Sequence, residues 1–212
     1  MGNPSDNYPF HWSVYQWIDG ETASHENIAD LNQFATDLAH FLHALQCIDS
    51  FGGPVAGEHN FYRGGSLKIY DLEVQQAITK LSTEIDMQLI TYIWNNALSS
   101  TWNKPPVWIH GDIAPTNLLV ENGTLAAVID FGGLAIGDPA CDYAIAWTFF
   151  DTKSRMIFRK TLAIDNGTWN RARGWALWKA LITHAQLPGT NSAEKRNAKK
   201  IIDVIVADYK NE

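Results

Sequence analysis

The chain has 212 residues with a net charge of −7 at pH 7, and 46% of its residues are hydrophobic. This acidic balance argues against nucleic acid as the main partner, because binding to a phosphate backbone needs a basic surface. The chain has no charged start followed by an apolar run, and no apolar run approaches the roughly 20 residues that span a bilayer. We therefore expect a cytoplasmic protein without a membrane partner.

The first part of the chain predicts one strand, one helix and one loop. Residues 12–20, WSVYQWIDG, are typical of a short strand that ends in an Asp-Gly turn. Apolar residues recur at helical spacing over residues 27–48, where Ser24 or Asn27 could cap the helix. The glycine-rich residues 51–65 are predicted to form a loop.

The second part predicts more helices around a single hairpin. Two apolar runs flank Asn122-Gly123, the dipeptide that most strongly indicates a two-residue hairpin turn, so we expect a hairpin over residues 117–130. Asp138 and Pro139 stand at the N-cap and first position of a helix that is expected to start in GDPACDYAIAWTFF, where each is favoured. Further helices are expected in two places between residues 71 and 98, and near residues 152–163, 168–186 and 192–210. The predicted fold class is α+β and mainly helical, with an embedded β-hairpin.

Two residue types bear on the core. Cys47 and Cys141 are the only cysteines, and both lie in helix-like apolar patterns. We expect two buried free thiols, with a disulfide left open. The nine tryptophans are expected to fill the core of a helical domain rather than to line a cleft.

Three oxygen-bearing side chains are predicted to meet at the open end of the hairpin. Asp112 follows a short strand, Asn117 begins the next strand, and Asp130 ends the strand that returns. A buried carboxylate is costly unless it is paired or binds a metal. Amide and carboxylate oxygens suit Mg²⁺, which completes its shell with water and phosphates. Asn117 and Asp130 are therefore candidate metal ligands, and Asp112 is left free to accept a proton from an alcohol.

The strings HGDIAPTN, IDFG and GDPACD follow one another in this part of the chain. Their order and spacing resemble those of the aminoglycoside phosphotransferase family of small-molecule kinases. The resemblance implies the large C-terminal lobe of the protein-kinase-like fold. It also implies Asp112 as the catalytic base, Asn117 and Asp130 as Mg²⁺ ligands, and Leu119 under the adenine of ATP.

The resemblance extends upstream to SVYQWIDGE, which is similar to the strand and hinge that join the two lobes of a kinase. It implies that Tyr15 faces the back of the nucleotide pocket and that the backbone of Trp17 and Ile18 meets the adenine edge. An edge strand with aromatic packing is the alternative. On this interpretation residues 1–20 are the remnant of the hinge strand and lobe linker, and residues 21–212 are the helical C-terminal lobe.

A kinase fold also has a small β lobe, which supplies a glycine-rich loop over the phosphates and a lysine that pairs with them. The eleven residues before Trp12 contain no lysine and cannot form such a lobe. We therefore expect weak ATP binding by this chain alone. We also expect exposed apolar surface at the hinge, which a second copy of the chain could cover in a homo-oligomer.

Several of these residues have a plainer interpretation. Asp112 and Asp130 could be turn formers, and Asp138 is assigned to helix capping. Asp142 could support the catalytic loop or complement a helix dipole. His110 is interpreted as a hydrogen-bonded organiser of the loop rather than as a proton shuttle.

The predicted function is transfer of the γ-phosphoryl group of ATP, with Mg²⁺, to a hydroxyl of a small molecule, and the acidic balance fits a cationic acceptor. The alternative is a non-catalytic remnant or binding module of the same fold. A metal-dependent hydrolase is disfavoured, because the sequence offers no histidine-rich ligand set. Acceptor-binding residues are sought after Asp142, where each candidate could equally be core or surface: Asp151, Arg155, Trp169, Arg173 and Trp175.

Overall fold

The first apolar repeat forms helix α1, Leu31–Gln46, in the computed structural model, which describes residues 1–212. Its N-cap is Asp30, whose side chain accepts two backbone N–H groups at 2.8 and 3.3 Å. The predicted caps instead bond to each other, because the backbone N–H of Ser24 donates to Asn27 Oδ1 at 2.9 Å. The helix therefore begins later than its apolar pattern indicated.

The predicted hairpin is present. Strands β3, Leu118–Glu121, and β4, Thr124–Val128, pair in antiparallel fashion around the two-residue turn. Asn122 and Gly123 have φ angles of 52° and 81°, the left-handed pair that a type I′ turn requires. A two-residue strand β1, Glu21–Thr22, adds to the other edge of β3 and completes a three-stranded sheet in the order β1-β3-β4.

A second, two-stranded sheet positions the motif that begins at His110. Strand β2, Val107–Ile109, pairs antiparallel with β5, Ala135–Gly137, and Ile109 lies opposite Ala135. The end of β2 therefore lies beside the start of β5, which follows directly on the loop after the hairpin. This pairing brings the segment after β2 close to the segment after β4.

The remaining helices agree with the expected ones within a few residues. Their bounds are α2 Asp71–Lys80, α3 Met87–Leu98, α5 Thr152–Thr161, α6 Asn166–His184 and α7 Lys195–Lys210. The helix expected to start at Asp138 is instead a 3₁₀ segment, Pro139–Ala144, followed by the short helix α4, Ile145–Thr148, and the two connect β5 to α5. No helix is both long and apolar enough to cross a membrane. The molecule is thus α+β and mainly helical, as predicted.

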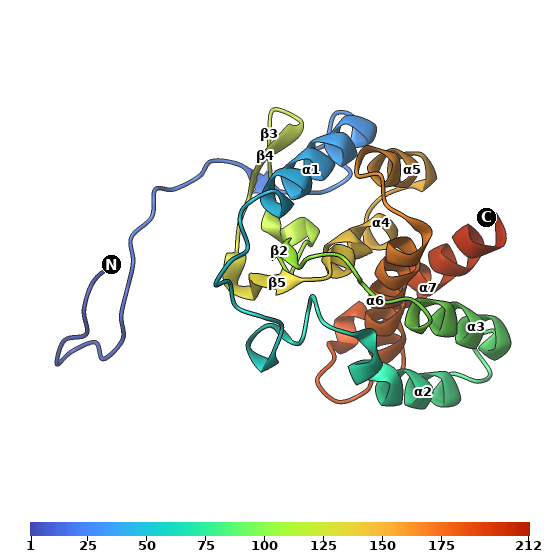
Figure 1. The fold of residues 1–212 in the computed structure, drawn as a ribbon. Helices are drawn as coiled ribbons and strands as arrows, with labels where there is room; N and C mark the ends of the chain where they lie inside the picture. The colour runs from blue at the N-terminus through green and yellow to red at the C-terminus, as the bar shows by residue number, and fades with distance from the viewer.

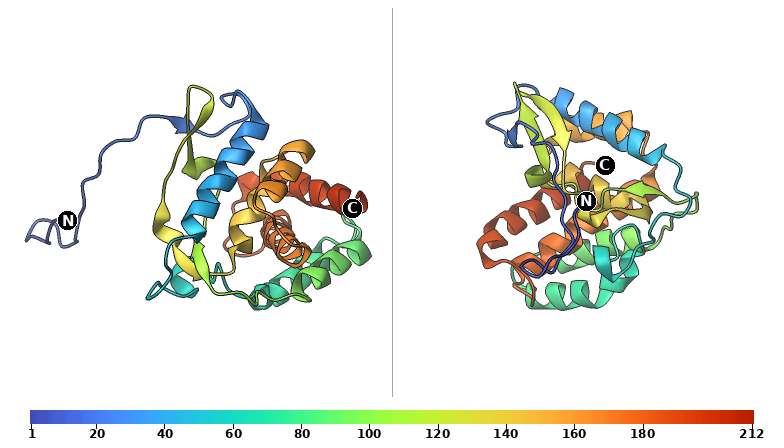
Figure 2. Two further views of the ribbon diagram at one scale, coloured as in Figure 1. Left: turned by 45° about the horizontal axis from the view of Figure 1, so that its top comes forward. Right: turned by 90° about the vertical axis from the view of Figure 1, so that its left-hand side faces the viewer.

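Helix α6 is the axis of the helical core, and it packs against α2, α3 and α7 (Figure 1; Figure 2). It is buried around almost its whole circumference, as expected for a helix inside a bundle rather than on its surface. Three of its tryptophans, Trp169, Trp175 and Trp178, are each less than 10% exposed. The expectation that tryptophans fill the core is confirmed for this helix.

The predicted strand over residues 12–20 is wrong. Trp12 forms only an isolated bridge with Gly2, residues 13–20 have no strand structure, and Trp17 is 84% exposed. Figure 1 shows the segment leaving β1 and running away from the helical body. A strand gains its hydrogen bonds from a neighbouring strand, and none lies alongside residues 13–20. The aromatic content of this segment and its alternation of apolar and polar residues were therefore not sufficient to form a strand.

The expectation of two buried thiols is also wrong for Cys47. Its side chain is exposed at the C-terminal end of α1, whereas Cys141 is partly buried beside the 3₁₀ segment. Both thiols are free. The apolar pattern placed Cys47 close to the end of a helix correctly, but Cys47 is the C-cap and its side chain is exposed, whereas Leu45 in the last turn is buried.

Candidate active site

The turn after β2 is organised by Asp142. The backbone N–H groups of His110 and Gly111 both donate to its carboxylate at 2.8 Å. Burial raises the pKa of Asp142, although these two N–H groups and the nearby His110 oppose the shift. Because the carboxylate is fully buried and bonded to the loop, the structure assigns it to loop support and not to a helix dipole.

His110 is the second organiser of this turn. Its side chain is fully buried; Nδ1 accepts the backbone N–H of Asp112 at 3.2 Å, and Nε2 lies 2.9 Å from the carbonyl oxygen of Ile129. Since Nδ1 accepts, the ring proton is on Nε2 and is donated to Ile129. Both ring nitrogens are therefore engaged with backbone, which confirms the structural interpretation of His110.

Gly111 is required by two features of the turn. Its φ of +82° lies in the left-handed region, and a Cβ there would lie 2.3 Å from the carbonyl oxygen of Gly133. The motif is therefore packed directly against the loop that follows Asp130.

Asp112 and Asn117 are brought together as expected. Asn117 Nδ2 donates to the backbone oxygen of Asp112 at 2.9 Å and to Asp112 Oδ2 at 3.2 Å. The Asp112 side chain is 47% exposed, so its carboxylate is open to a ligand. One detail was wrong: Asn117 does not begin the strand but ends a 3₁₀ turn, Pro115–Asn117, and the strand starts at the next residue.

Asp130 lies at the same end of the hairpin. The carbonyl oxygen of Asn117 accepts the N–H of Ile129 at 2.9 Å, so Ile129 lies opposite Asn117 and Asp130 is the next residue along. Asp130 has a φ of 61°, and its Oδ1 accepts the N–H of Gly132 at 3.3 Å. Its other oxygen has no hydrogen-bond donor.

The donor set fits Mg²⁺. Asn117 donates its amide N–H groups to Asp112, and its side-chain oxygen accepts no hydrogen bond. One carboxylate oxygen of Asp130 also accepts no hydrogen bond. No group of three or more histidine, cysteine, aspartate or glutamate side chains is arranged so that it could hold a metal ion by itself. One amide oxygen and one carboxylate oxygen are what Mg²⁺ commonly takes from a protein when phosphates and water complete its shell.

The residues expected around adenine differ in their exposure. Leu119 is buried in β3, with its Cβ 3.1 Å from the position that a Cβ on Gly20 would take. Trp17 and Ile18 are 84% and 48% exposed in the segment before β1. Their role at a nucleotide stays a prediction.

Four of the five acceptor candidates lie in the core, and the exposed fifth, Asp151, is a helix cap. Arg155 and Arg173 pair with Asp208, Asp151 caps α5, and Trp169 and Trp175 are buried. Sequence reasoning instead missed Arg63, whose Nη2 lies 3.3 Å from Asp112 Oδ1. No local pattern identifies it, because the contact depends on how residues 51–65 fold against β5.

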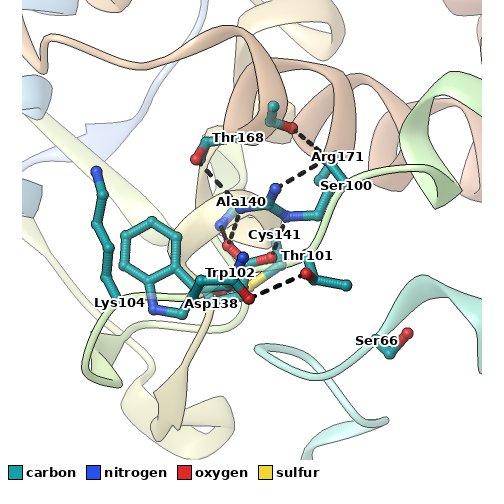
Figure 3. A network of polar contacts seen from close by, with 12 residues as sticks. Ser66, Ser100, Thr101, Trp102, Lys104, Asp138, Ala140, Cys141, Thr168 and Arg171 are labelled. Atoms are coloured by element: carbon teal, nitrogen blue, oxygen red, sulfur yellow. Dashed lines mark hydrogen bonds and ion pairs between the residues drawn. The ribbon is translucent and has the colours of Figure 1, made fainter.

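Asp138, the first aspartate of the string GDPACD, is in a different environment from Asp112. Asp138 caps the 3₁₀ segment through the N–H of Ala140 and also forms a buried ion pair with Arg171 Nε at 2.6 Å (Figure 3). Both side chains are 8% exposed. The capping role is confirmed, and the ion pair is an addition that the sequence did not show.

Comparisons with known proteins bear on the family and the fold of the chain. Residues 1–178 match the sequence model of the phosphotransferase enzyme family, APH. The GDP and kanamycin complex of APH(2")-IIia covers 100% of this chain and 74% of that one, with 20% identity and a TM-score of 0.64. The GDP complex of wild-type aminoglycoside 2'-phosphotransferase-IIIa covers 93% and 70%, with 19% identity and a TM-score of 0.59.

A third solved structure is the apoenzyme of a macrolide 2'-phosphotransferase from Brachybacterium faecium, with 18% identity and a TM-score of 0.50 over 96% of this chain and 67% of that one. No curated protein sequence matches the chain. At these identities the likeness shows the fold alone, and it confirms the kinase-like fold expected from the motifs.

Proposed function

Because the chain belongs to the phosphotransferase enzyme family, we propose that it transfers the γ-phosphoryl group of a nucleoside triphosphate to a hydroxyl of a small molecule. The observation that carries the proposal is the half-exposed Asp112 carboxylate, held beside Asn117 and Asp130 at one end of the hairpin. A general base must lie within reach of the proton it takes, and the Asp112 carboxylate is open to solvent and to a ligand, while the exposed Asp130 is the carboxylate proposed to hold Mg²⁺.

The proposed reaction uses these residues in distinct roles. Asp112 accepts the proton of the acceptor hydroxyl while the new O–P bond forms and the bond between the γ-phosphorus and the nucleoside diphosphate breaks. Asn117 and Asp130 would hold Mg²⁺, which when bound supplies positive charge to the phosphates. Asp142 and His110 keep the loop in place.

The donor is proposed to be ATP, and GTP should be tested beside it because two of the similar structures are GDP complexes. The acceptor is proposed to be a small molecule such as an aminoglycoside, in keeping with the acidic balance of the chain. The test is transfer of labelled γ-phosphate from ATP or GTP, with Mg²⁺, to aminoglycosides, macrolides, sugars and amino alcohols. Transfer that disappears when Mg²⁺ is chelated supports the proposal, and no transfer to any acceptor class counts against it.

The exposure of Trp17 and Ile18 favours a second candidate, a binding module that keeps the acceptor site but does not turn over. An adenine against these residues would be covered from one side only. We expect calorimetry with ATP and Mg²⁺ to give a Kd no tighter than about 1 mM, or roughly −4 kcal/mol. A micromolar Kd would show that the chain holds the nucleotide well. It would contradict the weak nucleotide binding on which this second candidate depends.

A further inference from the structure

One cation contacts the candidate catalytic base. Arg63 Nη2 lies 3.3 Å from Asp112 Oδ1, and the side chains are 26% and 47% exposed. The Arg63 guanidinium makes no other hydrogen bond or ion pair, although it stands 5.5 Å from the centre of the Phe61 ring. A guanidinium carries five N–H donors in a fixed planar fork, so most of its donors remain available for a ligand at this site.

The backbone of Arg63 is held in place from both sides. Buried Asn60 donates to the carbonyl oxygen of Arg63 at 2.9 Å and to that of Gly133 at 3.4 Å. On the other side, the carbonyl oxygen of Gly64 accepts the N–H of Asp138 at 2.8 Å. The loop is therefore bonded to the segments before and after β5, and Arg63 projects from between these two attachments.

The loop also contains an unusual backbone conformation. Phe61 and Tyr62 are consecutive non-glycine residues with φ angles of 54° and 53°. Left-handed non-glycine residues are strained and persist where surrounding contacts hold them, often at functional sites. One such contact is visible, because the Tyr70 hydroxyl donates to the carbonyl oxygen of Phe61 at 2.5 Å.

We propose that Arg63 is a catalytic residue that contacts the transferred phosphoryl group. This inference rests on the proposed function. The acceptor hydroxyl must lie between Asp112 and the phosphorus. A guanidinium that contacts Asp112 and has free N–H donors therefore lies close to the position that the phosphoryl oxygens would take. Arginine stays charged and binds phosphate oxygens in pairs. As the bond to the nucleoside diphosphate breaks and the bond to the acceptor oxygen forms, Asp112 takes the proton and Arg63 stabilises the charge on the phosphoryl oxygens.

The first test needs no turnover. Binding of inorganic phosphate in the presence of Mg²⁺ is measured by calorimetry for the wild type, Arg63→Met, Arg63→Lys and a control variant, Lys68→Met. Lys68 is an exposed cation a few residues further along that forms no ion pair. Arg63→Met should weaken binding at least about tenfold, Arg63→Lys less, and Lys68→Met not measurably. Absence of phosphate binding by the wild type, or equal binding by Arg63→Met, overturns the inference.

The second test measures transfer. Arg63→Met should lower kcat about 10²-fold or more, while KM for the acceptor changes by less than about threefold. Guanidinium ion added to Arg63→Ala should restore part of the rate, which a purely structural role would not allow. Transfer with an unchanged kcat in Arg63→Met refutes the inference and leaves the proposed function intact. Phosphate binding that depends on Arg63 in a wild type without transfer removes the proposed function and retains Arg63 as a phosphate-binding residue.

Discussion

Two arginine–aspartate pairs lie at opposite ends of the β2–β5 sheet, and they differ in almost every physical respect. Arg171 and Asp138 are 2.6 Å apart and 8% exposed (Figure 3), whereas Arg63 and Asp112 are 3.3 Å apart and 26% and 47% exposed. Both aspartates follow a glycine in a short motif, so the sequence presents them alike.

Saturation of the hydrogen-bonding groups separates the two pairs. Arg171 contacts both oxygens of Asp138 and also donates to Ser100 and Thr168, so four of its five N–H donors and both carboxylate oxygens are already engaged. Each oxygen of Asp112 has a single long contact. A saturated buried pair is a structural element, and an unsaturated exposed carboxylate is available for proton transfer.

The largest expected effect is on activity. Asp112→Asn keeps the size of the side chain but removes its ability to accept the hydroxyl proton, so the rate of phosphate transfer should fall about 10²- to 10⁴-fold. The free energy of unfolding in urea should stay within about 1 kcal/mol of the wild type, since the carboxylate is half-exposed. Full turnover by the variant would make Asp112 a loop residue and leave the kinase interpretation to the fold alone.

The second effect is on stability and concerns the other pair. Asp138→Asn keeps a good N-cap, but it leaves the buried Arg171 guanidinium without a counter-charge, so unfolding should become easier by about 3–5 kcal/mol. The matched control is Asp151→Asn, which replaces the N-cap of α5 and should cost less than about 1 kcal/mol. Equal losses for the two variants in urea unfolding would mean that Asp138 is a cap and nothing more.

The sequence predicted features that depend on neighbouring residues but not contacts between residues far apart in the chain. The hairpin, α1 and the capping role of Asp138 depend on neighbouring residues, and the sequence predicted all three. The Arg171 contact joins α6 to the N-cap of the 3₁₀ segment, 33 residues earlier in the chain, and the Arg63 contact depends on the hydrogen bond from Asn60 to Gly133. The strand predicted over residues 12–20 failed for the same reason, because a strand depends on a neighbour that local pattern does not reveal.

A third carboxylate is less exposed than that of Asp112 and more exposed than that of Asp138. Asp208 is 16% exposed and accepts hydrogen bonds from Trp147, Arg155 and Arg173. Burial, the largest single influence, would raise its pKa, but the Trp147 indole and the two guanidiniums together lower it below 3.8. The unfolded chain therefore takes up the proton first as pH falls, so the stability from Asp208 is present above about pH 4 and is lost as pH falls through the folded-state pKa.

The measurement is urea unfolding of the wild type and Asp208→Asn between pH 7 and pH 3. The difference in unfolding free energy should be largest near neutral pH and should shrink as the pH falls below the unfolded value of 3.8. A difference that stays constant over this range would show that the charge on Asp208 adds nothing to the packing of its side chain.

The smallest expected effect completes the comparison. Arg63→Met removes the cation but keeps an apolar stem, and exposed ion pairs are screened by water and salt, so the loss of unfolding free energy should be below about 1 kcal/mol. Asp112→Asn combined with Arg63→Met should show little coupling beyond this. The loop itself is held by Asn60, which the substitution leaves untouched. A loss as large as that for Asp138→Asn would place Arg63 among the structural cations, and a fall in kcat for Arg63→Met would then reflect a disturbed loop rather than a lost contact with the phosphoryl group.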